Sequence, residues 1–358
     1  MKKILALLLV VALGVSLTAC SGGGASSTAP SAAASSAADT ADSADDSAAD
    51  AIVVKYSVTY AAAGTQADGA HALAELIEEH SDGRMKMEFY PSSQLGDKAA
   101  TFEGLRKGTI EMSECAATDM SSFNTMWSVF SLPYLWENGA QAVNTVSDPA
   151  VKAILNADAE ANGFVIIGWY DIGSRSIMNS KRLTTNPQEL NGLKIRCMED
   201  TVLANSITAM GAIATPMAAG EVFTALQQGT IDGTDHTPAS LYDFRFHEVA
   251  KYLTLTEHFT IPGIVFVSKP WFDNLSAENQ EAILQAGEAW SDKWNNGIWP
   301  DATNAGLKAL AEAGVEIAEI DKTPFVEAVQ SVVDDFLAKA TDEQKALYEL
   351  LLETREKY

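Results

Sequence analysis

Cysteine and basic residues are both scarce in this sequence of 358 residues. It contains 3 Cys, and 24 Lys and Arg stand against 48 Asp and Glu, which gives a formal charge of −24 at pH 7. Three cysteines cannot form the dense disulfide framework of a small secreted domain. The acidic surplus argues against a nucleic-acid binder, because such proteins need clustered cations to neutralise phosphates. The 47% hydrophobic content argues against full disorder and is enough for one large or two ordinary domains.

Familiar catalytic motifs are also missing. The sequence has no Gly-x-Ser-x-Gly elbow, no phosphate-binding loop, no Gly-x-Gly-x-x-Gly after a strand and no His-Glu-x-x-His. Asp232, Asp235 and His236 could hold a metal or supply a general base, but their spacing is specific to neither role. We therefore expect no enzyme, no cofactor and no resident metal.

The first twenty residues have the pattern of a removable export signal. Lys2 and Lys3 precede an apolar run over 4–15, which is shorter than the roughly 20 residues that a spanning helix needs. The run is followed by Leu-Thr-Ala-Cys20, which resembles a bacterial lipobox, in which the cysteine thiol is lipidated and becomes the mature N-terminus. We predict a lipoprotein signal peptide over 1–19 and an extracytoplasmic protein anchored to the membrane through Cys20. The alternative is an ordinary signal peptide with a chance cysteine.

A low-complexity segment follows the lipobox. Residues 21–50 consist only of Ser, Ala, Gly, Asp, Thr and one Pro, and they include five of the acidic residues. Such a segment cannot bury enough apolar area to offset the entropy of ordering it. We interpret residues 20–50 as a lipid-anchored flexible tether that holds a folded body clear of the membrane.

Strand and helix patterns alternate from residue 51 onward, which is typical of an α/β fold. Gly108 and Gly229 are expected to end helices, Ser276 and Thr341 to begin them, and Pro300 to kink or end the long helix that Ser276 opens. Strands are expected at 52–60, 84–90, 109–116, 163–169 and 261–267.

Arg196 lies in a further predicted strand. In residues 193–198 the period of two places Leu193, Ile195 and Cys197 on one face and Lys194, Arg196 and Met198 on the other. An arginine in a mid-domain strand is costly to desolvate unless an anion meets it, and its planar fork can bind a carboxylate through two parallel hydrogen bonds. On this segment alone a solvated or internally paired arginine is the simpler interpretation.

Six separated motifs favour instead the interpretation of Arg196 as an anion-binding residue. They occur in a fixed order along the body: Tyr90-Pro-Ser-Ser-Gln-Leu-Gly-Asp97, Leu132-Pro-Tyr-Leu135, Leu190-Asn-Gly-Leu-Lys-Ile-Arg196, Thr215-Pro-Met217 followed by Glu221, Ala225-Leu-Gln227, and Ile231-Asp-Gly233. With this ordered set, the stretch from Val53 to about residue 340 resembles the DctP-type substrate-binding proteins of tripartite ATP-independent periplasmic (TRAP) transporters.

The resemblance implies both a fold and a mechanism. The fold is a two-lobed periplasmic-binding-protein-like α/β fold (class II type) with hinge strands and a long connecting helix. It implies lobe I at 51–172 with 261–300, lobe II at 173–260 with 301–345, and a C-terminal helix end at 346–358. A small organic anion, such as a C4-dicarboxylate, a sugar acid or an oxo acid, would close the lobes. The closed form, expected to be a monomer, would dock on the TRAP permease subunits in the membrane.

The resemblance also implies substrate-binding residues. Arg196 matches the family arginine that pairs with the substrate carboxylate, and Arg175 resembles the second arginine near the ligand. His236 occupies the position of a family asparagine that binds the carboxylate, and Asp235 beside it could orient this histidine or face solvent. The charge of a histidine there would depend on pH near neutrality, and if it donates to the carboxylate when charged, the affinity should weaken as pH rises.

Trp169, Tyr60 and Thr118 lie in stretches that line the cleft in relatives, although Trp169 is equally compatible with a core position. Residues 218–220 read Ala-Ala-Gly where many relatives have a phenylalanine, which leaves room for a larger ligand or for Trp169.

A second function class stays open at this point, namely a surface hydrolase or other carbohydrate-active lipoprotein. A cation that bridges ligand and protein occurs in some relatives that bind oxo acids. Cys115 and Cys197 lie in apolar strands and are expected to be free, although an exported protein permits a bridge between them.

Overall fold

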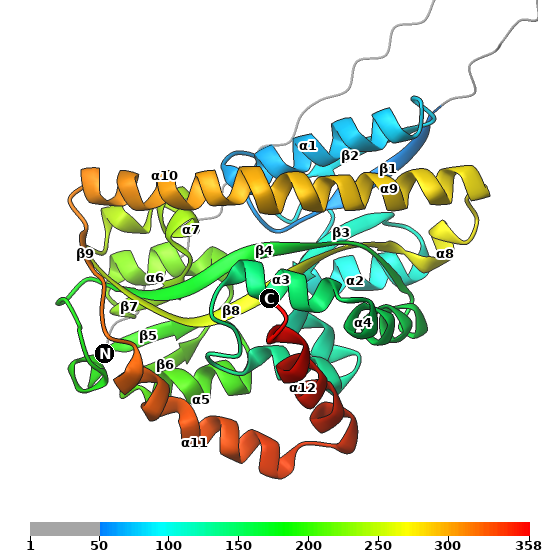
Figure 1. Cartoon of the computed structure of the whole chain (residues 1–358). Coiled ribbons are helices and arrows are strands. Elements are labelled where there is room, and N and C mark those ends of the chain that lie inside the picture. Colours follow the sequence, from blue (N-terminus) through cyan, green and yellow to red (C-terminus); the bar gives the residue numbers. More distant parts are fainter. Residues whose placement is uncertain (1–50) are drawn as a thin grey trace, which may run out of the picture. The chain divides into compact units, whose positions relative to one another are not determined.

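A mixed sheet of nine strands connects the elements of residues 51–358, the part of the chain that this computed structural model describes (Figure 1). The strands follow one another in the order β2-β1-β3-β8-β4-β7-β5-β6, and β9 pairs with β8. Their bounds are β1 Ile52–Ser57, β2 Met85–Tyr90, β3 Met112–Ala116, β4 Phe164–Asn179, β5 Lys194–Cys197, β6 Ile213–Pro216, β7 Gly233–His236, β8 Tyr252–Ser268 and β9 Glu316–Ala318. The predicted signal peptide, Cys20 and the tether lie outside the described residues.

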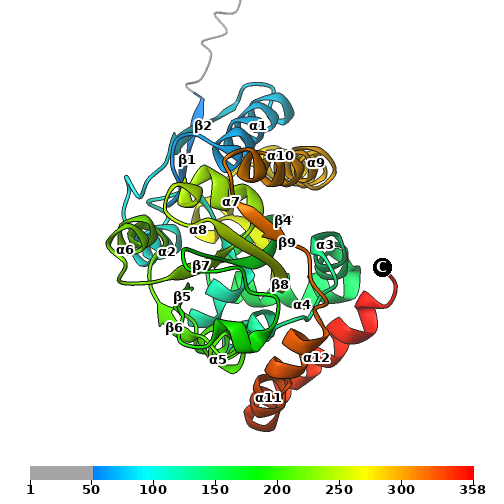
Figure 2. The same cartoon turned by 90° about the vertical axis from the view of Figure 1, so that its left-hand side faces the viewer.

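Helices cover both faces of this sheet (Figure 2). The α-helices are α1 Thr65–His80, α2 Lys98–Lys107, α3 Gly139–Ser147, α4 Pro149–Ala161, α5 Thr201–Ala209, α6 Val222–Gln228, α7 Pro238–Asp243, α8 Lys269–Phe272, α9 Ala277–Lys293, α10 Trp299–Glu312, α11 Thr323–Lys339 and α12 Asp342–Arg355. Short 3₁₀ turns are η1 Ala117–Ser122, η2 Thr125–Ser131, η3 Pro187–Leu190, η4 Ala219–Glu221 and η5 Phe246–Glu248. None of the helices in residues 51–358 is both long and apolar enough to cross a membrane.

The long strands β4 and β8 belong to both halves of the sheet. They pair with each other in antiparallel fashion, β3 pairs with β8 on one side, and β7 pairs with β4 on the other. Both strands were expected to be short apolar runs, and this expectation was wrong. They continue through polar residues such as Arg175 and Thr256, whose side chains have hydrogen-bond partners inside the protein and therefore do not end the strand.

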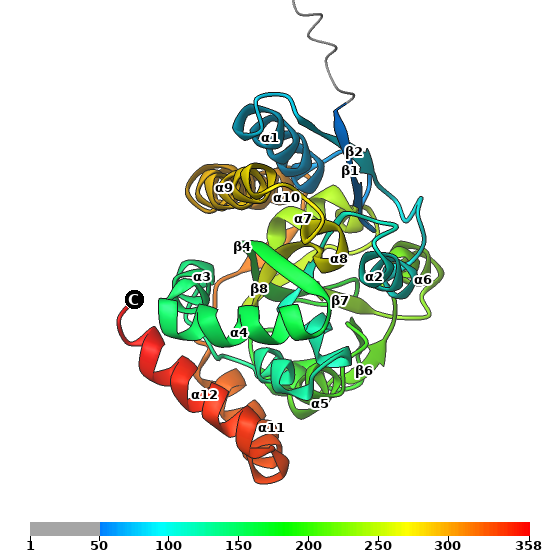
Figure 3. The ribbon, with the colours of Figure 1, turned by 90° about the vertical axis from the view of Figure 1, so that its right-hand side faces the viewer.

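Four large apolar clusters pack against the sheet. Helices α1 and α9 cover one face beside β1 and β2, whereas α3, α4 and α12 cover the opposite face. Beyond the long strands, α6, α7 and α10 share a cluster, and α5 shares another with α11 (Figure 3). The long strands are thus buried by helices from both sides, and the α/β architecture predicted from the sequence is confirmed.

Helices α9 and α10 lie end to end along one face of the sheet (Figure 1). The helical run continues past Pro300 into α10, so Pro300 does not end it, but the regular α-helical pattern is interrupted directly before the proline. A π-helical turn at η6, Trp294–Ile298, shifts the hydrogen-bond pattern, and Pro300 then falls in the first turn of α10. A proline is tolerated there because its missing N–H would have no partner within the helix.

The predicted helix ends agree with the structure where a glycine ends the helix or a capping side chain begins it. Gly108 and Gly229 adopt the left-handed conformation directly after α2 and α6, with φ of 72° and 69°. Ser276 accepts from the backbone N–H of Asn279 at the start of α9, and Thr341 forms a capping box with Gln344 at the start of α12.

Gly287 sets how closely α9 approaches β4. A Cβ atom at this position would lie 2.3 Å from the backbone carbonyl oxygen of Ile167. We expect Gly287→Ala to lower the free energy of unfolding by about 1–3 kcal/mol, because helix and strand must move apart. Thermal or urea denaturation measures the change. Gly297→Ala is the matched control, since its Cβ would meet nothing within 4 Å, and equal stability of the two variants would contradict this packing.

Candidate functional site

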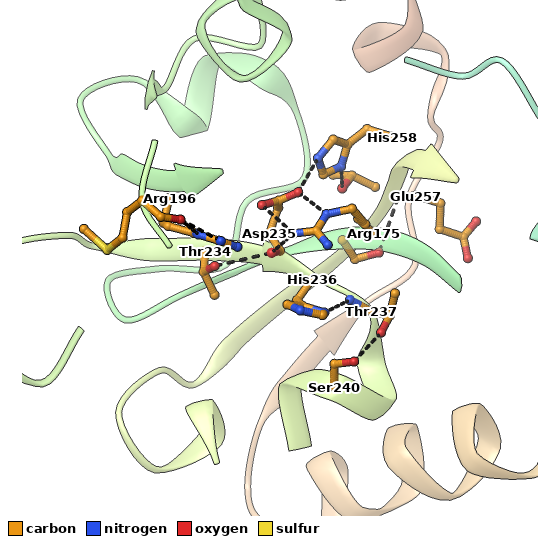
Figure 4. Close-up of polar contacts among 12 residues, drawn as sticks. Arg175, Arg196, Thr234, Asp235, His236, Thr237, Ser240, Glu257 and His258 are labelled. Atoms are coloured by element: carbon orange, nitrogen blue, oxygen red, sulfur yellow. Dashed lines mark hydrogen bonds and ion pairs between the residues drawn. The ribbon is translucent and has the colours of Figure 1, made fainter. Parts of the chain in front are cut away.

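The candidate site is built on three neighbouring strands of the second half of the sheet, β4, β7 and β5 (Figure 4). Residue pairing brings Asp235 opposite Ile177, His236 opposite Ser176, and Arg196 opposite Thr234. Ligands of open α/β sheets bind outside the carboxyl ends of strands, and Arg196 and His236 lie at or next to such ends.

Arg175 and Asp235 form a buried ion pair between β4 and β7. Arg175 Nε donates to Asp235 Oδ2 at 2.5 Å, and Nη2 donates to Oδ1 at 3.0 Å and to the Asp235 carbonyl at 2.7 Å. Burial by itself would raise the pKa of the Asp235 carboxyl, but Arg175 outweighs it and holds that pKa well below its usual range. The guanidinium charge of Arg175 is therefore neutralised by the protein itself.

His258 on β8 supports the same carboxylate. Its Nε2 lies 3.7 Å from Asp235 Oδ2, and its Nδ1 shares a hydrogen bond of 2.8 Å with the Thr256 hydroxyl. Burial keeps the pKa of His258 below its usual value in spite of the neighbouring carboxylate. Sequence reasoning missed His258 and Thr256, because a single histidine in a strand carries no signal of the partner that it meets.

Arg196, unlike Arg175, has no carboxylate bound to its guanidinium within residues 51–358. Its side chain is buried, yet none of the ion pairs formed within residues 51–358 involves it, and Nε and Nη2 both donate to the carbonyl of Met217, at 2.9 and 2.7 Å. Burial first, and then the charge of Arg175, lower the pKa of Arg196 to about 10, so the guanidinium stays charged at neutral pH. A buried cation that only a carbonyl holds favours the arrival of an anion.

His236 is uncharged in this setting. Its Nδ1 accepts from the backbone N–H of Thr237 at 2.9 Å, and its ring packs edge-on against Phe244. Burial, Arg175 and Arg196 lower the pKa of His236 well below its usual value. Burial and the two arginines therefore oppose the protonation near neutral pH that the sequence led us to expect. With Nδ1 occupied, the neutral ring has its Nε2–H to offer as a donor, as an asparagine amide would.

The other three predicted residues lie in the first half of the sheet or directly after its strands. Trp169 belongs to the apolar core and stacks on Trp127, with ring centroids 6.2 Å apart, which favours the core interpretation. Its Nε1 and the Thr118 hydroxyl are buried without a hydrogen-bond partner in the described part of the chain. Tyr60 donates to the Tyr56 hydroxyl at 3.4 Å. These side chains do not join the cluster around Asp235.

The metal interpretation of Asp232, Asp235 and His236 gains no support. Asp232 accepts from the Lys194 backbone N–H at 2.9 Å and pairs with Lys181, whereas Asp235 is taken by Arg175. No three His, Cys, Asp or Glu side chains among residues 51–358 are placed to share a metal ion. Cys115 and Cys197 are both free and buried, as expected.

Comparison with known proteins identifies the class of protein to which this chain belongs. The family model described as "Bacterial extracellular solute-binding protein, family 7" (DctP) matches residues 56–340. The chain belongs to this family, and it is a TRAP-type solute-binding protein with the two-lobed fold, a transport receptor and not an enzyme. The interpretation as a surface hydrolase is thereby set aside.

Particular relatives cover most of the chain. The 2,3-diketo-L-gulonate-binding periplasmic protein of Escherichia coli is 30% identical over 280 residues, 77% of this chain and 85% of that protein. The C4-dicarboxylate-binding periplasmic protein of Rhodobacter capsulatus is 30% identical over 292 residues, 79% and 86% of the two chains. A TRAP periplasmic solute-binding protein of Sulfitobacter with bound β-D-galacturonate is 30% identical, with a TM-score of 0.79, and the match covers 84% and 99%.

A neutral His236 predicts that asparagine can replace it. We expect His236→Asn to bind the same organic acid, with a ratio of wild-type to variant affinity that stays constant between pH 6 and pH 8. The reason is that neither side chain changes its charge in that range. Calorimetric titration at three pH values measures the ratio. A wild-type advantage that grows as pH falls would instead show that the imidazolium contributes.

Proposed function

We propose that this protein captures a sugar acid between its two lobes, with the ligand carboxylate bound by Arg196 and His236, and delivers it to a TRAP permease. The observation that carries the proposal is Arg196 itself, a buried guanidinium that forms no ion pair within residues 51–358. Arg175 would act mainly as the ion-paired neighbour that fixes Asp235 and β7, and not as a second free cation.

The charge of the whole chain makes a local cation necessary. With 48 acidic against 24 basic residues, the protein repels an approaching anion at long range. Screening limits this repulsion to roughly 8 Å at physiological ionic strength. A buried arginine is screened far less and can therefore hold a carboxylate in spite of the acidic exterior.

The choice of a sugar acid rests on the named relatives. The Escherichia coli relative is described as binding 2,3-diketo-L-gulonate, and the Sulfitobacter structure holds galacturonate. The Rhodobacter relative, described as binding C4-dicarboxylates, supports the wider class of carboxylates. All three descriptions share a carboxylate, which is the group that Arg196 is suited to bind.

Lobe closure would follow from a ligand that touches both lobes. We propose that lobe I comprises 51–172 with 261–300 and lobe II comprises 173–260 with 301–345. Such a ligand binds the closed form more tightly than the open form and shifts the population toward it. The closed form would then be the one that the permease subunits recognise.

Arg196→Ala tests the proposed carboxylate site. In a thermal-shift screen against hexuronates, hexonates, oxo acids and dicarboxylates, a true ligand stabilises the wild type by about 2.7 kcal/mol at a hundredfold excess over its Kd. We expect Arg196→Ala to lose this stabilisation while its own unfolding stays cooperative. Lys194→Ala, which removes an exposed cation from the same strand, is the matched control and should bind normally. Unchanged affinity of Arg196→Ala in calorimetry would refute the assignment.

Membrane anchoring through Cys20 is a separate part of the proposal. It is supported by the Leu-Thr-Ala-Cys20 sequence at the end of the signal-like segment. Two acyl chains anchor stably, because each buried methylene contributes roughly 0.8 kcal/mol. We expect Cys20→Ser to move the protein from the membrane fraction to the soluble fraction on cell fractionation, with ligand binding unaffected. Retention of the variant in the membrane fraction would exclude this cysteine as the anchor.

A further inference from the structure

Glu114 on β3 lies among three tyrosines in the first half of the sheet. The Tyr56 hydroxyl donates to Glu114 Oε2 at 2.8 Å, and the Tyr60 hydroxyl lies 3.4 Å from that of Tyr56. Tyr170 of β4 packs over Gly263 of β8, the strand between β3 and β4, and its hydroxyl lowers the pKa of the same carboxyl. The three tyrosines are buried, whereas Glu114 keeps partial exposure. A carboxyl group is thus held among tyrosine hydroxyls in a largely apolar surrounding, in a residue that keeps partial exposure.

This carboxyl lies near the strand ends that face Arg196. Strands β1, β3 and the first part of β4 run in the same direction, so Tyr60, Thr118 and Tyr170 lie close to or just beyond their carboxyl ends. Lys98, at the start of α2, interacts electrostatically with Glu114 and also with Arg196 on β5. Lys98 is thus within electrostatic range of both residues.

The charges of this region form a simple pattern. Lys98 is paired with Asp119, with 2.8 Å between Nζ and Oδ2, just as Arg175 is paired with Asp235. His236 and His258 are neutral, because the pKa of each is lowered. The region also holds the positive charge of Arg196, with exposed Glu199 in electrostatic range, and the carboxyl of Glu114. Unpartnered polar atoms lie in the same half as Glu114, namely the Thr118 hydroxyl and the Trp169 indole N–H.

We propose that Glu114, together with the hydroxyls of Tyr60 and Tyr170, receives the hydroxyl-bearing end of a ligand whose carboxylate is held by Arg196, and thereby selects hydroxylated monocarboxylates over dicarboxylates. This inference rests on the proposed function and narrows its substrate class. A ligand hydroxyl donates a hydrogen bond to the Glu114 carboxylate. A second ligand carboxylate at the same place meets a like charge, which is strongly unfavourable in a partly desolvated site.

The selection depends on pH in a defined direction. Burial raises the pKa of Glu114 to about 7, although hydrogen bonds from Tyr56 and Tyr170 and the charge of Lys98 act against this. The other groups that face Glu114 do not titrate between pH 6 and pH 8, because the pKa values of Tyr56, Tyr60, Tyr170, Cys115 and Lys98 are all raised above their usual alkaline values. Protonation of Glu114 below pH 7 removes the like charge and admits a dicarboxylate.

Galactonate and galactarate are the matched probes, because they share a six-carbon chain with the same hydroxyls and differ only in a terminal CH₂OH or carboxylate. We expect the wild type to bind galactonate at least about tenfold more tightly than galactarate at pH 8, since like charges oppose each other in a site of low dielectric. Its affinity for galactarate should rise as pH falls from 8 to 6. In Glu114→Gln the preference should shrink severalfold, and the pH dependence for galactarate should disappear.

Two further variants separate this role from a structural one. Tyr170→Phe removes one hydroxyl and should weaken galactonate binding more than galactarate binding. Glu103→Gln neutralises an exposed carboxylate on α2 and should leave the ratio of the two affinities unchanged. Thermal unfolding without ligand checks that each variant is folded, and calorimetry at pH 6, 7 and 8 gives the affinities.

The outcomes distinguish the inference from the proposed function. Binding that requires Arg196, with the same galactonate preference in Glu114→Gln as in the wild type, overturns the role of Glu114 alone. Tighter binding of galactarate than galactonate at pH 8 does the same. Failure of the wild type to bind any organic acid of the screen overturns the proposed function itself.

Discussion

The carboxylate of Asp235 is the interaction on which the candidate site depends. It neutralises Arg175, meets His258, and joins β7 to β4 and β8 at the point where the two halves of the sheet connect. A buried guanidinium without a partner is strongly unfavourable, so this pair keeps Arg175 inside the sheet without an anion from outside. Arg196, one strand farther away, has only the Met217 carbonyl. The site therefore holds two arginines but only one uncompensated positive charge.

The charged groups of α2 and β3 also have partners close by. Lys98 is neutralised by Asp119, and Glu114 stays among tyrosine hydroxyls with a pKa of about 7. In the proposed arrangement, a cation at one end and a titratable carboxyl at the other would suit a ligand with one acidic end and one hydroxylated end. An acidic protein can bind such an anion because desolvated local charges outweigh the screened field of the distant surface.

Local signals in the sequence predicted helix ends well and strand lengths poorly. Gly108, Gly229, Ser276 and Thr341 act within one turn of their own helix, so neighbouring residues are enough to identify them. The polar halves of β4 and β8 looked unlike strands, because Arg175 and His258 are stable inside a sheet only with partners on other strands. The sequence around Pro300 likewise did not show that the helix resumes after a π-helical turn, which lies where Trp294 stacks on Trp299.

By itself the sequence determined the class of the fold, the family and the placement of Arg196 in a strand, because alternation and ordered motifs are properties of short segments. It could not decide which of the two arginines is free, since the partner of Arg175 lies 60 residues away. Nor could it show that the pKa of His236 is lowered, that Trp169 is a core residue, or that Glu114 lies among three tyrosines. Charge state and burial depend on every group that surrounds a side chain, and only the tertiary structure brings those groups together.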